Sequence, residues 1–185
     1  AVQMSGRDYT GVLVLAGMEE HTILKEWSDK PVCAVRFAGT HMIPTADGEL
    51  LATDVYLPGT IVSKHVLDPA AVCSGPFPTQ VPAVLVRTPY GKRDGAEQYY
   101  RFVQRGYAVV VQDVRGREDS TGEWMPNYYE VEDGSDTLDW IAAQPWSDGN
   151  VGMTGGSYLG YVQWAAAASG NPHLKAILSS VCAGS

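Results

Sequence analysis

The segment from Val151 to Gly160 (VGMTGGSYLG) carries the residues best suited to chemistry. A short apolar strand runs into glycines and Ser157, and an apolar helix is predicted to follow directly. A serine on a sharp strand-to-helix turn presents its hydroxyl as a nucleophile for acyl transfer, and the tight backbone needs glycines nearby. Gly155 lies two residues before the serine, but Leu159 stands where the usual five-residue pattern has a second glycine. The segment therefore indicates a variant nucleophile elbow.

The residue after the serine adds a second chemical group. At the start of the predicted helix, the backbone N–H of Tyr158 is free to face an oxyanion that forms beside the Ser157 hydroxyl. A different interpretation is an ordinary helix N-cap, because serine is favoured there and two glycines make a good turn. The motif alone leaves both interpretations open.

The elements that must position this turn follow from the hydrophobic pattern. Four short apolar runs predict strands buried on both faces of a parallel sheet: 83–86, 108–111, 151–154 and 176–178. Helical patterns lie between or beside them, at 95–105, 130–144 and 158–169, the last apolar nearly all round and so expected to be buried. The alternation of strands and helices predicts an α/β fold.

The N-terminal part has a different pattern. Runs 32–37 and 50–57 flank a turn signal at 46–48 and predict an antiparallel hairpin at a sheet edge. Five prolines make 58–82 a long connecting loop. We expect residues 1–31 to form an appendage or edge strand, and residues 32–185 to form one domain.

Composition excludes several classes of protein. Thirteen Lys and Arg against 21 Asp and Glu give a net charge of −8, which argues against nucleic acid and anionic membrane surfaces as partners. The three cysteines have no close spacing and indicate neither a disulfide framework nor a metal site. No targeting segment is recognisable, so we expect a cytoplasmic protein, with secretion as the alternative.

Five segments together resemble one family, the cocaine-esterase and X-Pro dipeptidyl-peptidase group of serine hydrolases. They are DGELLATDVYLP (47–58), VLVRTPYGK (84–92), RGYAVVVQDVRGREDSTGEW (105–124), EDGSDTLDWIAAQPWSDGNVGMTGGSYLG (132–160) and NPHLKAI (171–177). The resemblance covers roughly residues 45–177. It implies an α/β-hydrolase fold and cleavage of esters, amides or peptides, with no metal or organic cofactor.

The resemblance also implies roles for three residues. Ser157 matches the nucleophile, Tyr158 matches the residue whose backbone N–H forms half of the oxyanion hole, and Tyr90 matches the tyrosine whose hydroxyl forms the other half. Without the resemblance, Tyr90 would be interpreted as a half-buried turn aromatic after a proline. Glu118 departs from the family pattern, which has a glycine at this position.

A catalytic acid and base are not recognisable after the serine. This fold supplies them in the order Ser, Asp or Glu, His, yet residues 158–185 hold no acidic residue and only His173, which the resemblance places in a structural segment. We therefore expect the N-terminal portion of a larger hydrolase, apparently incomplete, that is stable only with a complementary C-terminal chain or segment, or as a homo-oligomer. The alternative is a catalytically inactive hydrolase-like module that binds a partner through its exposed sheet edge.

Three other groups of residues suggest chemistry but have simpler explanations. Asp133, Asp136 and Asp139 are interpreted as a solvated helix face rather than a metal site. The tryptophans at 140, 146 and 164 are expected to pack in the core and at its rim. Asp113 and Arg115 are expected to form an ion pair that shapes the loop after their strand.

Overall fold

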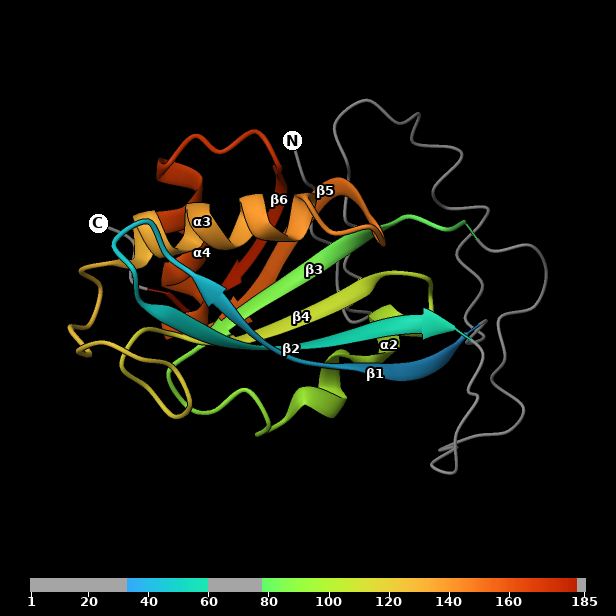
Figure 1. The fold of residues 1–185 in the computed structure, drawn as a ribbon, viewed down its shortest axis with the longest axis horizontal. Helices are drawn as coiled ribbons and strands as arrows, with labels where there is room; N and C mark the ends of the chain where they lie inside the picture. Colours follow the sequence, from blue (N-terminus) through green and yellow to red (C-terminus); the bar gives the residue numbers. More distant parts are fainter. Residues whose placement is uncertain (1–32, 60–77, 183–185) are drawn as a thin grey trace.

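A computed structural model describes residues 33–59 and 78–182. Six strands form one sheet in the order β1-β2-β4-β3-β5-β6 (Figure 1). The strands are β1 (Ala34–Pro44), β2 (Leu50–Gly59), β3 (Val81–Thr88), β4 (Ala108–Asp113), β5 (Ser147–Gly156) and β6 (Leu174–Ser180). β2 is antiparallel to β1 and β4, whereas β4, β3, β5 and β6 run parallel. The predicted α/β class with an edge hairpin is confirmed.

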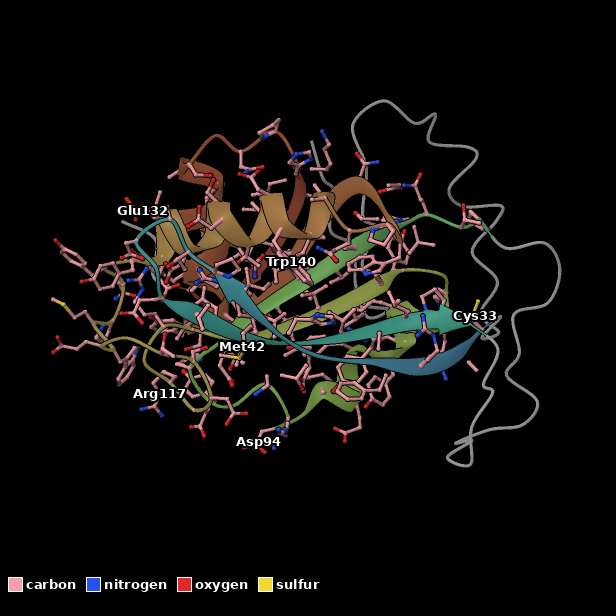
Figure 2. The ribbon with its side chains drawn as sticks, in the orientation of Figure 1. Cys33, Met42, Asp94, Arg117, Glu132 and Trp140 are labelled. Atoms are coloured by element: carbon pink, nitrogen blue, oxygen red, sulfur yellow. The ribbon has the colours of Figure 1, made fainter. Side chains whose placement is uncertain are left out.

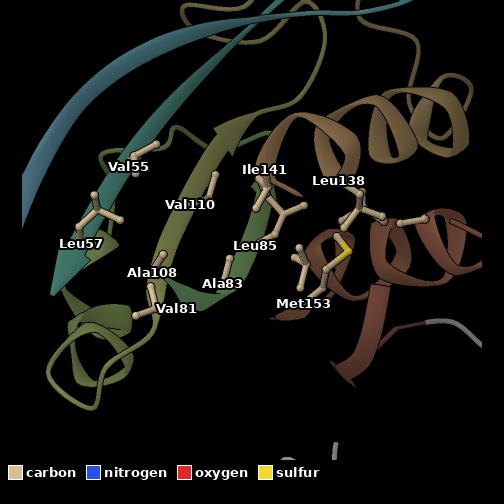
Figure 3. Close-up of a cluster of buried hydrophobic side chains, with 13 residues drawn as sticks. Val55, Leu57, Val81, Ala83, Leu85, Ala108, Val110, Leu138, Ile141 and Met153 are labelled. Atoms are coloured by element: carbon tan, nitrogen blue, oxygen red, sulfur yellow. The ribbon is translucent and has the colours of Figure 1, made fainter. Parts of the chain in front are cut away.

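Alternate residues of the central strands build two cores on opposite faces of the sheet. On β3, Leu85 packs in the core shared with helices α3 (Glu130–Ala142) and α4 (Tyr158–Ala168), shown in Figure 3. Its neighbour Val86 faces the other core, which η1 (Ala96–Tyr99) and α2 (Tyr100–Val103) cover. Because a strand buried on both faces needs no polar alternation, its sequence is a continuous apolar run.

The edge hairpin is longer than the apolar runs predict. β1 continues to Pro44, and its pairing with β2 shifts register between Phe37 and Gly39. Gly39 has φ 113°, a backbone angle that favours glycine, and the bulge it permits interrupts the strand pattern. Trp140 of α3 packs against His41 of β1, with the ring centroids 5.3 Å apart and the rings tilted by 54°, as expected for a packing residue; Figure 2 labels Trp140.

Two helix predictions need correction. The segment 95–105 forms only η1 and the one-turn α2, because Gly95 has φ 76° and the first turn closes with 3₁₀ geometry. Helix α4 is not buried all round, since Trp164 is 57% exposed. One face of α4 packs on β5, β6 and α3, and within the described residues no element covers the other face.

Two predictions about the N-terminal part and the cysteines have different outcomes. The predicted appendage 1–31 and most of the loop 58–82 lie outside the described residues. Cys33, the residue before β1 (Figure 2), is disulfide-bonded, which the cysteine spacing did not indicate. None of the helices that the structure describes is long and apolar enough to cross a membrane.

Candidate active site

Ser157 occupies the turn between β5 and α4. Its backbone has φ 58° and ψ −123°, a conformation that residues with a side chain rarely adopt. The turn is fixed by hydrogen bonds on both sides: Ser157 N–H donates to the Ser180 carbonyl at 3.0 Å, and its own carbonyl accepts from Gly160 N–H at 2.9 Å. The serine itself is exposed at the carboxyl end of the parallel strands, where ligands bind in open α/β sheets.

The helix-cap interpretation does not describe Ser157. A capping serine has extended backbone angles, and its hydroxyl accepts a hydrogen bond from an N–H of the first turn. Ser157 has a positive φ, and its side chain makes no cap hydrogen bond. The hydroxyl therefore does not stabilise the helix, and the strain at this residue calls for another explanation.

Glycines on both sides let the chain make this turn. Gly155 has φ 143°, and a Cβ there would collide with the Leu159 side chain. A Cβ on Gly160 would lie 2.9 Å from the Ser180 carbonyl oxygen, so Gly160 lets α4 approach β6. Leu159 can replace the usual glycine because it fills the space that Gly155 leaves open.

Tyr90 lies on the loop after β3, the strand next to β5. Leu85 pairs with Met153, so the ends of these strands, Thr88 and Gly156, lie level, three residues further along. The loop and the turn therefore leave the sheet side by side at the same edge. Tyr90 is 58% exposed, and its N–H donates to the Thr88 hydroxyl at 3.0 Å. The fold brings the Tyr90 segment next to that of Ser157 and Tyr158.

A buried ion pair holds the Tyr90 loop. Lys92 Nζ lies 2.9 Å from the Asp113 carboxylate, and both side chains are almost completely buried. Asp113 also accepts from Lys92 N–H at 2.6 Å, and the half-exposed Asp119 accepts from Nζ. Burial alone would lower the pKa of Lys92, but the hydrogen bonds to Asp119 and Asp113 more than offset this and raise its pKa. Arg117 Nε donates to the Pro89 carbonyl at 2.9 Å.

Glu118, the departure from the expected glycine, adopts the conformation that a glycine would favour. Its φ is 48°, in the left-handed region. The loop from 113 to 121 therefore closes despite the substitution, at the cost of backbone strain. Glu118 therefore carries backbone strain that a glycine at this position would not have.

The Tyr158 side chain joins a buried charged network that the sequence did not predict. Its hydroxyl donates to Glu130 Oε1 at 2.6 Å, and Arg87 Nη1 donates to Glu130 Oε2 at 2.7 Å. Burial of Tyr158, together with its hydrogen bond to the Glu130 carboxylate, raises the pKa of Tyr158 to about 12. A sequence signal was available: Arg87 directly follows the apolar run 83–86, and a guanidinium buried at the end of such a run needs an acidic partner.

The aspartate row on α3 is only in part the solvated face that the sequence predicts, since Asp139 is exposed and Asp136 partly exposed, but Asp133 is buried. Asp133 is 1% exposed and forms an ion pair with Arg115. Burial raises the pKa of Asp133 more than Arg115 lowers it. Asp136 accepts from the Ala46 N–H, and Asp139 accepts from Asn171. No metal-binding group of His, Cys, Asp and Glu occurs among the described residues.

The expected ion pair between Asp113 and Arg115 is also wrong in its partners. Asp113 pairs with Lys92, as described above, and Arg115 bridges Asp133 and Asp47. Arg115 ties the β1–β2 turn to the first turn of α3, and its hydrogen bonds hold the pKa of Asp47 well below the usual range. Both residues do shape the loop after β4, each through a different partner.

The described histidines lie away from the serine. His173 precedes β6, and its Nδ1 is 2.9 Å from the Gly149 carbonyl oxygen near the start of β5, at the opposite edge from Ser157. This fits its predicted structural role. His41 lies on β1, the outermost strand, and His21 and His65 fall outside the described residues.

Comparison with known proteins gives consistent results. The chain is 44% identical over 150 residues to the cocaine esterase of Rhodococcus sp., covering 78% of this chain and 23% of that protein. Among solved structures, it resembles a CocE/NonD family hydrolase from Staphylococcus aureus at 27% identity (TM-score 0.60; 77% of this chain, 26% of that one). An aminopeptidase from a marine Thaumarchaeota archaeon is similar at 25% identity (TM-score 0.61; 82% and 26%).

The chain spans about a quarter of the length of these relatives. The fold of the described residues is accordingly the N-terminal part of an α/β hydrolase, with the hairpin edge followed by parallel strands. The family model for X-Pro dipeptidyl-peptidases matches residues 47–185, three quarters of the chain and all of the candidate site. The chain therefore belongs to the X-Pro dipeptidyl-peptidase (S15) family.

Proposed function

We propose that the chain carries the nucleophile of a serine hydrolase that cleaves an ester or amide through an acyl-enzyme on Ser157. The observation that carries this proposal is the backbone of Ser157, strained at φ 58° and exposed with no capping hydrogen bond. Strain of this kind persists at functional sites because the surrounding structure enforces it. Here the enforcement comes from the glycines and from hydrogen bonds on both sides of the turn.

The proposed chemistry uses two hydrogen-bond donors at the sheet edge. Ser157 Oγ attacks the substrate carbonyl, its proton passes to a base, and the negative charge develops on the carbonyl oxygen. Tyr158 N–H, at the first position of α4, has no acceptor among the described residues and donates to that oxygen. The Tyr90 hydroxyl is the second donor. The base then gives its proton to the leaving group, and water releases the acyl group.

We propose that the acid and base come from a complementary segment or chain, or from a second copy. Apolar side chains on the β6 side support this, since Trp164 on α4, Leu178 on β6 and Val181 are 57%, 49% and 90% exposed. Exposed apolar surface next to a strand that has no further partner among the described strands favours association. The family relatives, four times as long, have room for such a segment.

The test is labelling of the native sample with a fluorophosphonate, followed by denaturing intact mass and peptide mapping. We expect one adduct, on Ser157, because the probe reacts with activated serines. The same spectrum reports each chain in the sample and so identifies the source of the base. Ser157→Ala should lose the adduct and the hydrolysis of p-nitrophenyl acetate. Hydrolysis that persists at the wild-type rate in Ser157→Ala would remove the assignment.

The exposed apolar face also favours a second candidate function, a hydrolase-like module that binds a partner without catalysis. Trp164 is the largest of these exposed side chains. A stable complex or oligomer with an unlabelled Ser157 would favour the module. An adduct on Ser157 would favour the enzyme, with or without the complex.

A further inference from the structure

Three side chains from three elements form a continuous chain of contacts beneath the site. Arg87 lies on β3, Glu130 begins α3 and Tyr158 begins α4. Arg87 Nη1 is 2.7 Å from Glu130 Oε2, and the Tyr158 hydroxyl donates to the other oxygen, Oε1, at 2.6 Å. The carboxylate therefore bonds the guanidinium and the phenol at the same time.

Burial makes this chain rigid. The side chains of Arg87 and Glu130 are 0% and 5% exposed. Separating the pair would therefore leave two buried charges without a partner and without water. Arg87 Nε also donates to Gln112 on β4 at 2.8 Å, and Glu130 lies at the N-terminus of α3, where a negative charge is stabilised. The carboxylate thus presents a fixed acceptor to Tyr158.

The two ends of the chain lie next to the two proposed oxyanion donors. Arg87 is three residues before Tyr90 on the same segment. At the other end of this series of contacts, Tyr158 bonds Glu130 through its hydroxyl and also offers its backbone N–H to the oxyanion. Through its contacts with Arg87 and Tyr158, Glu130 links β3, the strand that leads to Tyr90, to the residue after the serine. We propose that Glu130, held by Arg87, is a positioning residue that sets the distance between the two halves of the oxyanion hole by fixing the Tyr158 side chain.

A positioning role of this kind has a kinetic signature. Oxyanion donors act on charge that appears in the transition state, so a displaced donor reduces kcat and leaves substrate binding nearly unchanged. A purely structural contact would instead reduce stability. Because the inference rests on the proposed hydrolase function, the experiment must separate the failure of one from the failure of the other.

The informative variant is Tyr158→Phe, which removes only the hydroxyl and leaves the backbone N–H and the Arg87–Glu130 pair in place. Tyr161→Phe is the matched control: it makes the same change one turn later on α4, where the hydroxyl donates to the Asn127 carbonyl at 3.3 Å. Tyr158 also contacts Asn127, whose N–H donates to its hydroxyl at 3.2 Å. The variants therefore differ chiefly in the link to Glu130.

On the native protein sample, kcat and KM are measured with p-nitrophenyl acetate, alongside fluorophosphonate labelling and the unfolding midpoint. We expect Tyr158→Phe to lower kcat about tenfold with KM within about twofold, because misplacement of a donor costs rate rather than binding. Tyr161→Phe should keep kcat within about twofold.

Each remaining outcome counts against a defined claim. A reactive wild type with an unchanged Tyr158→Phe variant overturns the positioning role and leaves the hydrolase proposal intact. Equal losses in the Tyr158→Phe and Tyr161→Phe variants also overturn it, because the effect is then not specific to Glu130. A wild type that neither takes the probe nor hydrolyses the ester overturns the hydrolase proposal, and the positioning role falls with it.

Discussion

The two segments that meet at the carboxyl edge of the sheet are held by different forces. Charge fixes the loop that carries Tyr90, through the buried Lys92–Asp113 pair and the half-exposed Asp119. Backbone geometry fixes the turn that carries Ser157. Ser157 N–H donates to the Ser180 carbonyl, and Gly155 and Gly160 lack the side chains that would collide with Leu159 and with β6. The first segment depends on pH and on paired charges, whereas the second depends on the absence of side chains.

At this edge of the sheet, a strained turn that carries Ser157 therefore lies beside a loop, carrying Tyr90, whose order depends on charge. A strained turn needs support that does not vary, and close packing around glycines supplies it at any pH at which the protein is folded. The Tyr90 loop contains the buried Lys92, so the order of this loop depends on the ion pair between Lys92 and Asp113. Variants that damage each kind of support separately test this comparison.

The largest effect is expected from Lys92→Met. The substitution leaves the fully buried Asp113 without its cation, which costs about 4 kcal/mol of unfolding free energy. Arg93→Met is the control, because Arg93 is 74% exposed and contacts the same Asp119 at 3.5 Å; it should cost no more than about 0.5 kcal/mol. Urea denaturation measures both variants. Equal costs would show that burial of the charge does not hold this loop.

Gly155→Ala tests the geometric support of the turn. The new Cβ would collide with Leu159 at a φ of 143°, so we expect a loss of about 3 kcal/mol of unfolding free energy and loss of labelling at Ser157. Gly170→Ala is the matched control: its φ is 70° but nothing lies within 4 Å, and it should cost only about 1 kcal/mol. A Gly170→Ala cost as large as that of Gly155→Ala would remove the packing argument.

The pH dependence sharpens the contrast. Hydrogen bonding to Lys92 lowers the pKa of Asp119, so the carboxylate stabilises the fold above its ordinary pKa, and this contribution is lost as the pH falls through the lowered value. Asp119→Asn should therefore flatten the fall of the urea midpoint below about pH 4. Glu132→Gln, which removes one exposed carboxylate on α3, is measured alongside as the reference for loss of a single charge. An unchanged slope in Asp119→Asn would contradict the charge-held loop.

The smallest effect is expected from Glu118→Gly. Glycine relieves the left-handed strain at φ 48°, and part of that gain is offset by the greater entropy of the unfolded chain, so we expect a stabilisation of about 0.5 kcal/mol. Asn127→Gly is a suitable comparison, because asparagine tolerates its φ of 68° and the change should be near zero. A destabilised Glu118→Gly variant would mean that the glutamate side chain supports the loop.

The local elements of the site were predictable from the sequence. The apolar runs predicted β3, β4, β5 and β6, and the glycines around Ser157 predicted the turn, because continuous apolar runs and tight turns depend on neighbouring residues. The expected burial of β6 on both faces was wrong, since β6 ends the described sheet and Leu178 is 49% exposed. The length of β1 was not predictable, since its bulge at Gly39 breaks the pattern that periodicity detects. The exposed face of α4 was also missed, because an apolar pattern reports what a helix can bury and not what covers it.

By itself, the sequence determined the kind of fold and the turn that carries Ser157, because these follow from short-range patterns; the role expected of Tyr90 came from the resemblance to the family, and its place beside Ser157 came from the pairing of β3 with β5. Only the tertiary structure decided which charges meet. Arg87 pairs with Glu130, 43 residues further along the chain, and Glu130 accepts a hydrogen bond from Tyr158, 28 residues beyond it. The buried Asp133 pairs with Arg115. A buried charge must find a partner in space, and that choice is made when β3, α3 and α4 pack together.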